Sequence, residues 1–382
     1  MKNYRLYFTK GFITLIDELL YEHYSLIQKE DFLHFFYLIE RKPDKDNMVA
    51  LPSSIRESFG TKNRQWKFKI IVDILEENNI ITSTSYSNMK GKNYCKSYGY
   101  TNEFIEKVME TELDFILCDI SDKTYEAIRK HYTIPTDPIL LKHYETIKNL
   151  NINIDKATDF ARQYAGERLL RVMREIITIH TKDKVIVVDD PRTGRIFTSF
   201  NMMKKELREC CSFEGKELSS LDLKSSQPYL LSSILLNENP HEPEVQKFYE
   251  LVTKGDLYDW LSEIWGFKDI FSYDEARDMS KKMFFNYLYK KNQGTNSAQM
   301  LFSTNYPVVY DLIKNRKRKE ELWLSLQKLE ASIFIPVANK FVSEGCLSVH
   351  DSLYFPEGLR GNIESSLHDR FNLLKLTNYN LK

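Results

Sequence analysis

Two segments in the second half of the chain place an aspartate where a short apolar strand is predicted to end. Leu218–Leu231 starts as a strand that ends at Asp222 and then turns through small polar residues into a helix. Cys346–Pro356 contains two short apolar strands that meet at a polar tip formed by His350, Asp351 and the serine after them. A single strand-end aspartate is usually a cap or a turn residue. Two such tips, each framed by apolar strands, predict that both carboxylates face each other on one sheet.

Carboxylates placed in this way can hold divalent cations. A strand end is rigid, and the turn that follows leaves the carboxylate of Asp222 or Asp351 open to solvent and to a substrate phosphate. In-line phosphoryl displacement requires paired carboxylates that hold two Mg²⁺ ions about 3.5–4 Å apart. We therefore expect a cofactor of two Mg²⁺ ions, for which Mn²⁺ can substitute, bound by these two aspartates.

A third segment carries two cations and two aromatic residues at four-residue intervals: Arg277, Lys281, Phe285 and Tyr289. Residues at this spacing form one slanting stripe on a helix, with a rise of about 6 Å per step. The cations suit a triphosphate, and the rings suit a base and a sugar. An amphipathic helix with its aromatics in the core and its cations in water explains the same pattern, and this alternative stays open.

Taken in order, the three segments resemble motifs A, B and C of the family A nucleic-acid polymerases, which include bacterial repair-type DNA polymerases and phage and mitochondrial single-subunit RNA polymerases. Upstream, Thr193-Gly194-Arg195-Ile196 is similar to the TGR element of that family, so the resemblance covers about residues 190–357. It implies an α+β fold in which a helical N-terminal half precedes a polymerase palm, built on an antiparallel sheet, and a small helical fingers subdomain.

The resemblance also implies a role for each matching residue. Asp222 and Asp351 would bind the metal ions, and Arg277 and Lys281 would hold the incoming triphosphate, with Lys281 also catalytic. Phe285, Tyr289 and Gln227 would line the substrate pocket. Arg195 and His350 would contact the primer-template.

The chain departs from the family pattern at several positions. Gln227 stands where the DNA polymerases have a glutamate that closes off the 2′-hydroxyl and the RNA polymerases have glycine. The stretch that begins at Asp222 also looks like motif A of the family B polymerases, and Lys282-x3-Asn286-x2-Tyr289 fits their fingers pattern. Ser352 follows Asp351 as in the RNA polymerases. Because glutamine is bulky enough to crowd a 2′-hydroxyl, the sequence favours deoxynucleotides, although glutamine can also donate a hydrogen bond to that hydroxyl. The chain is thus expected to be a divergent relative.

The N-terminal region has a different sequence pattern, in which a predicted helix is followed by a predicted β-hairpin. Residues 62–79 predict a helix that stops at Asn78-Asn79, and residues 80–86 and 94–100 predict a hairpin with Lys90 and Lys92 at its tip. A helix followed by a basic-tipped hairpin is similar to the end of a winged-helix module, although the same pattern can simply cover a core. We expect a winged-helix-like module over 1–105, a helical thumb-like region over 106–182 and the polymerase core over 183–382, beginning with a buried strand at Val185–Val188.

Composition narrows the functional classes. Lysine plus arginine (54) equal aspartate plus glutamate (54), so overall charge gives no argument for nucleic acid, although a neutral total can hide a basic groove. Five cysteines without a CxxC pair indicate a reducing compartment and no zinc site. No apolar run is long enough to span a bilayer. A cytoplasmic location and no membrane partner are therefore expected.

The functional hypothesis is a Mg²⁺-dependent nucleotidyltransferase that extends a 3′-hydroxyl on a DNA template with nucleoside triphosphates, and DNA polymerase is favoured. No proofreading activity is expected, because no spaced acidic exonuclease motif precedes residue 180. Two alternatives remain. One is a primase-like or single-subunit RNA polymerase, with RNA as a partner. The other is a non-catalytic DNA-binding protein of replication or regulation, in which the palm-like half is structural.

Overall fold

A computed structural model describes residues 4–23, 27–39, 48–51, 59, 65–84, 96–104, 115–120, 134–164, 166–182, 185–289 and 297–382. The fold is α+β, as the sequence predicts: helices predominate, and the strand pairs formed by the described residues are antiparallel. The chain divides into two compact units. The first comprises residues 1–134, 152–185 and 203–210, and the second comprises residues 135–151, 186–202 and 211–382.

The first unit combines helices with two small sheets. β1 pairs with β5, and a three-stranded sheet has the order β2-β4-β3. Edge-to-face aromatic pairs fill its core, among them Phe12 with Phe36 and Phe68 with Tyr98. Its elements are β1 (Tyr4–Thr9), α1 (Lys10–His23), α2 (Lys29–Ile39), β2 (Val49–Leu51), α4 (Gln65–Glu77), β3 (Ile81–Ser83), β4 (Lys96–Tyr100), β5 (Phe115–Ile120), α8 (Ile154–Ala161), α9 (Gly166–Thr181) and α11 (Lys205–Arg208).

The helix and hairpin predicted in this unit are both present among the described residues. Helix α4 ends where expected, because the Asn78 side chain donates to the Ile74 carbonyl oxygen at 2.9 Å and Asn79 adopts φ 55°. Strand β3 pairs with β4 as the hairpin requires. Lys90 and Lys92, predicted at its tip, lie outside the described residues.

The second unit is built around an antiparallel sheet with the strand order β11-β12-β10-β9-β6. Its strands are β6 (Leu150–Ile152, at the border of the two units), β7 (Val187–Asp190), β8 (Arg195–Thr198), β9 (Cys211–Phe213), β10 (Lys216–Asp222), β11 (Leu347–Val349) and β12 (Ser352–Pro356). Its helices are α7 (Pro138–Asn149), α10 (Ser199–Met202), α12 (Ser226–Glu238), α13 (Pro243–Lys254), α14 (Leu257–Ile264), α15 (Tyr273–Tyr289), α16 (Ser297–Asn305), α17 (Pro307–Lys319), α18 (Leu322–Phe341) and α19 (Arg360–Leu373), with short 3₁₀ turns η2 (Val342–Glu344) and η3 (Glu357–Leu359).

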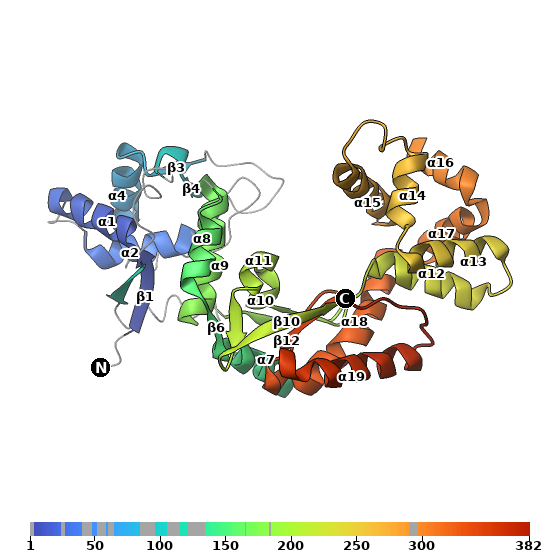
Figure 1. The fold of residues 1–382 in the computed structure, drawn as a ribbon. Helices are drawn as coiled ribbons and strands as arrows, with labels where there is room; N and C mark the ends of the chain where they lie inside the picture. The colour runs from blue at the N-terminus through green and yellow to red at the C-terminus, as the bar shows by residue number, and fades with distance from the viewer. Residues whose placement is uncertain are drawn as a thin grey trace. The chain divides into compact units, whose positions relative to one another are not determined.

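Helix α18 connects the parts of this unit. It lies beside the sheet and α19 (Figure 1), where it contacts strands β11 and β12, and it also packs on α12 and α15. A continuous apolar core joins these elements and includes Leu221, Phe334, Leu353, Phe355 and Phe371. Because α18 touches both the sheet and the helices α12 and α15, side chains on it can reach both parts.

The predicted buried strand at Val185–Val188 is wrong in part. Strand β7 begins at Val187, and Val188 is 49% exposed. The reason is that, among the described residues, β7 pairs only with β8 in a two-stranded ribbon, which leaves Val188 and Asp189 exposed to solvent.

Among the residues with described placement, no helix has both the length and the apolar character that crossing a membrane requires.

Gly345 provides a test of this packing. Its φ is +97°, and a Cβ there would lie 2.6 Å from the Phe213 ring carbon Cδ1. We expect Gly345→Ala to lower the free energy of unfolding by about 2–4 kcal/mol, from left-handed strain plus displacement of a buried ring. Gly215→Ala is the matched control, with φ +79° and no atom within 4 Å, and should lose only about 1–2 kcal/mol. Urea unfolding measures both; equal losses would contradict the close contact.

Candidate functional site

The pairing of β10 with β12 brings the two predicted carboxylates to the same end of the sheet. Asp222 lies opposite Ser352 in the strand register, and the Leu223 amide donates to the Asp351 carbonyl oxygen at 3.0 Å. Asp351 itself occupies the two-residue turn between β11 and β12, where His350 adopts φ 54°. The predictions that a strand ends at Asp222 and that a hairpin turn carries Asp351 are both confirmed.

The backbone around Asp222 is held from a second side. Its amide donates to the Lys382 carbonyl oxygen at 2.9 Å, and the Lys382 amide donates back to the Asp222 carbonyl oxygen at 3.1 Å. The chain then turns through Ser225, which has φ 53° and precedes the first residue of α12. The main chain that carries Asp222 is thus fixed on both sides.

The carboxylates lie close enough to influence each other electrostatically. Burial, followed by the negative charges of Glu330 and Asp222, raises the pKa of Asp351 to about 7, and the positive charge of Lys281 opposes this shift. Two half-buried acids with one opposing cation nearby form a site of excess negative charge. Such a site favours either a proton or a cation.

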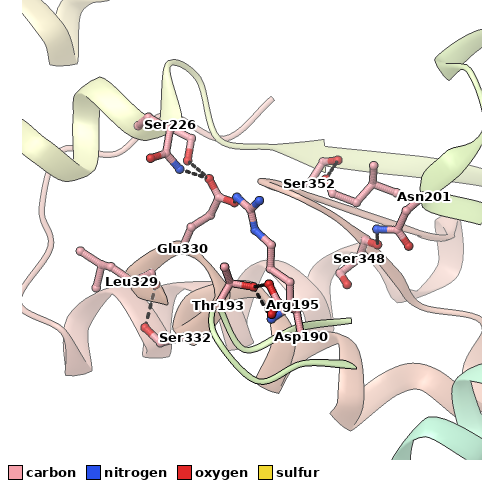
Figure 2. Close-up of polar contacts among 12 residues, drawn as sticks. Asp190, Thr193, Arg195, Asn201, Ser226, Leu329, Glu330, Ser332, Ser348 and Ser352 are labelled. Carbon is pink, nitrogen blue, oxygen red and sulfur yellow. Dashed lines mark hydrogen bonds and ion pairs between the residues drawn. The ribbon is translucent and has the colours of Figure 1, made fainter. Parts of the chain in front are cut away.

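Glu330, which the sequence analysis missed, provides the third negative charge. It is 2% exposed on α18, and its carboxylate accepts hydrogen bonds from the Arg195 guanidinium and from the Ser226 hydroxyl at 3.1 Å (Figure 2). The Gln227 side-chain nitrogen donates to the same carboxylate at 2.5 Å. One buried acid thus links β8, the start of α12 and α18. The sequence does contain a pattern that could have identified Glu330. It lies on the buried stripe of α18, with residues 326, 333, 334 and 337, and a buried acid needs hydrogen-bond or ionic partners.

Helix α15 presents the predicted stripe away from its own core. Its buried aromatics are Phe284 and Tyr287, whereas Lys281 and Tyr289 are exposed and the rings of Phe285 and Tyr289 pack 5.4 Å apart. The alternative in which the aromatics of the stripe belong to the core does not fit this arrangement.

Two members of the stripe, Lys281 and Tyr289, interact electrostatically with Asp351. The positive charge of Lys281 lowers the pKa of Asp351. Although the Tyr289 side chain is 37% exposed overall, burial of its hydroxyl raises its pKa; the charges of Glu330 and Asp351 add to this shift, and Arg195 opposes it. Arg277 is held by Asp259, with Nη1 2.7 Å from Oδ2. Tyr258, also missed from the sequence, lies near both ends of the stripe, because its ring lies under the Arg277 guanidinium at 5.7 Å. Burial raises the pKa of its hydroxyl, Tyr289 and Asp351 raise it further, and Arg277 lowers it.

Arg195 and His350 are the two residues of this unit that the sequence predicts at the primer-template. Arg195 begins β8 after a tight turn in which Gly194 has φ 74° and the Thr193 hydroxyl donates to Asp190 at 2.7 Å; its guanidinium is bound to Glu330. His350 is exposed beside Asp351. Asp222, Asp351, Lys281, Tyr289, Arg195 and Gln227 therefore gather in one region. Phe285 lies between Lys281 and Tyr289 on α15, and Arg277 lies one turn before Lys281.

A divalent cation fits the donor set. Within the described part of the chain, no group of three or more histidine, cysteine, aspartate or glutamate side chains is placed to hold a metal ion. Asp222 and Asp351 form a pair of oxygen donors, the ligand type that Mg²⁺ prefers, and substrate phosphate or water completes such sites. The Glu330 carboxylate is already occupied by Arg195 and two neighbours, so it contributes charge rather than a ligand.

Part of the chain matches a protein family. The family described as "Protein of unknown function (DUF1374)" matches residues 213–295. The matched region runs from β9 through α15 and contains Asp222 and the α15 stripe, but neither Arg195, Glu330 nor Asp351. No curated protein matches the chain.

The raised pKa of Asp351 predicts a pH-dependent stability. An ordinary aspartate titrates near 3.9 when unfolded, so its favourable contribution is complete below about pH 4 and is lost as the pH rises toward 7. In EDTA, Asp351→Asn should therefore be at least about 1 kcal/mol more stable than wild type at pH 8, and this gain should shrink toward pH 4. Urea unfolding across this range measures it, with exposed Asp369→Asn as control. A gain that does not vary with pH would contradict the placement of Asp351.

Proposed function

We propose that the chain is a nucleotidyltransferase that extends a 3′-hydroxyl with nucleoside triphosphates on a nucleic-acid template, with a palm formed by β10 to β12 and fingers formed by α12 to α17. The observation that carries this proposal is the convergence of Asp222, Asp351 and the α15 stripe at one place. Residues from three distant segments come near each other there, and this supports a role in phosphoryl transfer. The preference for deoxynucleotides expected from the sequence depends on Gln227 alone.

Each of these side chains would have its own role in the reaction. Asp222 and Asp351 would hold Mg²⁺, which when bound neutralises phosphate charge and promotes loss of the proton from the attacking hydroxyl. Arg277, oriented by Asp259, offers a planar fork to phosphate oxygens, and Lys281 offers a point charge between that fork and Asp351. Phe285 and Tyr289 supply adjoining rings for base and sugar. Positioning and charge compensation are what this reaction chiefly requires.

The N-terminal unit supports a nucleic-acid partner. The succession α2, β2, α4, β3, β4 with the sheet order β2-β4-β3 is what a winged helix would have. In that assignment α4 would enter a groove of DNA and the β3–β4 connection would contact backbone phosphate. A primer-template is the partner that agrees with both units.

Loss of either carboxylate should abolish incorporation. We expect Asp222→Asn and Asp351→Asn each to lower nucleotide incorporation by at least about 10³-fold in a primer-extension assay with Mg²⁺, because half of the cation site is removed. Both variants should stay folded, since a site carboxylate adds little stability. Exposed Asp369→Asn should keep full activity. A lane without template separates templated from untemplated synthesis.

The same assay distinguishes the non-catalytic alternative. A DNA-binding protein with a structural palm predicts that wild type and the Asp222→Asn variant bind DNA equally and that neither incorporates nucleotides. Absence of incorporation by folded wild type with every nucleotide and with both Mg²⁺ and Mn²⁺ would overturn the proposed function.

Two adjacent lysines test which face of α15 meets the triphosphate. Lys281 and Lys282 are both exposed, but the charge of Lys281 acts on Asp351. We expect Lys281→Ala to lower kcat/KM for nucleotide by about 10²-fold or more and Lys282→Ala to lower it less than about threefold. Steady-state kinetics with a primed template measure both. The reverse order would favour the family B register and contradict the stripe proposed here.

A further inference from the structure

Gln227 is enclosed within the protein rather than presented to a substrate. It is 7% exposed, and its side-chain nitrogen donates to the Glu330 carboxylate at 2.5 Å. Because a carboxylate can only accept, the nitrogen end of the amide must face Glu330. The other end, Oε1, is also shielded from solvent and has no hydrogen-bond partner in the described part of the chain. Neither end of the amide reaches the open side of the site.

Glu330 is well suited to fix this position. It is itself buried on the rigid helix α18, and its second oxygen is bound by Arg195, so the carboxylate cannot follow Gln227 if that side chain moves. The Ser226 hydroxyl donates to the same oxygen as Gln227, which anchors the first turn of α12. The link lies next to the nucleotide site, because the charge of Glu330 acts on both Tyr289 and Asp351.

We propose that Glu330 is a positioning residue that determines sugar selectivity: it holds the Gln227 amide away from the nucleotide, so that the site admits ribonucleotides as well as deoxyribonucleotides. This inference rests on the proposed function. A pocket that makes no contact with a hydroxyl rejects it by at most about 100-fold. Wild type should therefore use ribonucleotides with a kcat/KM within about 100-fold of that for deoxyribonucleotides, contrary to the preference expected from the size of glutamine.

The experiment compares the ratio of the two kcat/KM values in primer extension among variants. Gln227→Ala should leave the ratio within about threefold of wild type, because the removed amide does not contact the sugar. Glu330→Ala frees Gln227 to enter the pocket and should shift the ratio at least tenfold toward deoxyribonucleotides. The double variant Gln227→Ala/Glu330→Ala should return it to near the wild-type value, because nothing remains to be released.

Glu330→Gln is the conservative variant. A glutamine at this position can accept from Arg195 through its oxygen and donate to Gln227 Oε1, so the ratio should stay near that of wild type. A merely structural Glu330 would lower both kcat/KM values together and leave every ratio unchanged, and that result would overturn the proposal.

Glu330→Ala leaves the Arg195 guanidinium buried without its partner, so circular dichroism checks its folding. If that variant does not fold, Gln227→Ala still decides: a rise of more than about tenfold in relative ribonucleotide use would mean that Gln227 blocks the sugar, and would overturn the proposal. Incorporation of both nucleotide classes by wild type with an unshifted ratio in folded Glu330→Ala would reject the role of Glu330 while the proposed function stands. Incorporation of neither class would reject both.

Discussion

The antiparallel pairing of β10 with β12 is the constraint on which the rest of the site depends. A strand alternates its side chains with a period of two, so a shift of one residue in this register would turn Asp222 to the opposite face of the sheet and away from Asp351. The register is held by the apolar residues Leu221 and Leu353 in the core and by the hydrogen bonds of the Asp222 backbone with Lys382. Two charges that repel each other are thus kept together by interactions that do not involve the charges themselves.

Helix α18 then relates this pair to the rest of the unit. Its apolar stripe packs on the sheet and on the helices that carry the cationic and aromatic residues, while its one buried acid, Glu330, ties Arg195 and the start of α12 together. A buried carboxylate of this kind adds little net stability, because desolvation offsets much of the attraction, but it fixes the position of its partners. The apolar stripe of α18 and the hydrogen bonds of Glu330 therefore together position the residues of the site.

Local sequence patterns predicted the parts of the site that depend on local structure. The strand end at Asp222, the turn at Asp351 and the helical stripe from Arg277 to Tyr289 each follow from apolar periodicity and spacing within about 17 residues. Glu330 and Tyr258 were missed, because their importance arises from contacts with segments far away in the chain. Gln227 shows the same limit: its size is read from the sequence, whereas the direction of its amide is set by an acid 103 residues later. The winged-helix and polymerase assignments stay predictions.

Location of bound Mn²⁺ by anomalous diffraction tests the central claim most directly, because it asks whether Asp222 and Asp351 hold one cation site between them. Crystals soaked with Mn²⁺ and a nucleoside triphosphate should show an anomalous peak in contact with carboxylate oxygens of both aspartates, on the side that faces Lys281. Aspartates too far apart to share an ion, or Mn²⁺ bound only elsewhere on the chain, would contradict the account.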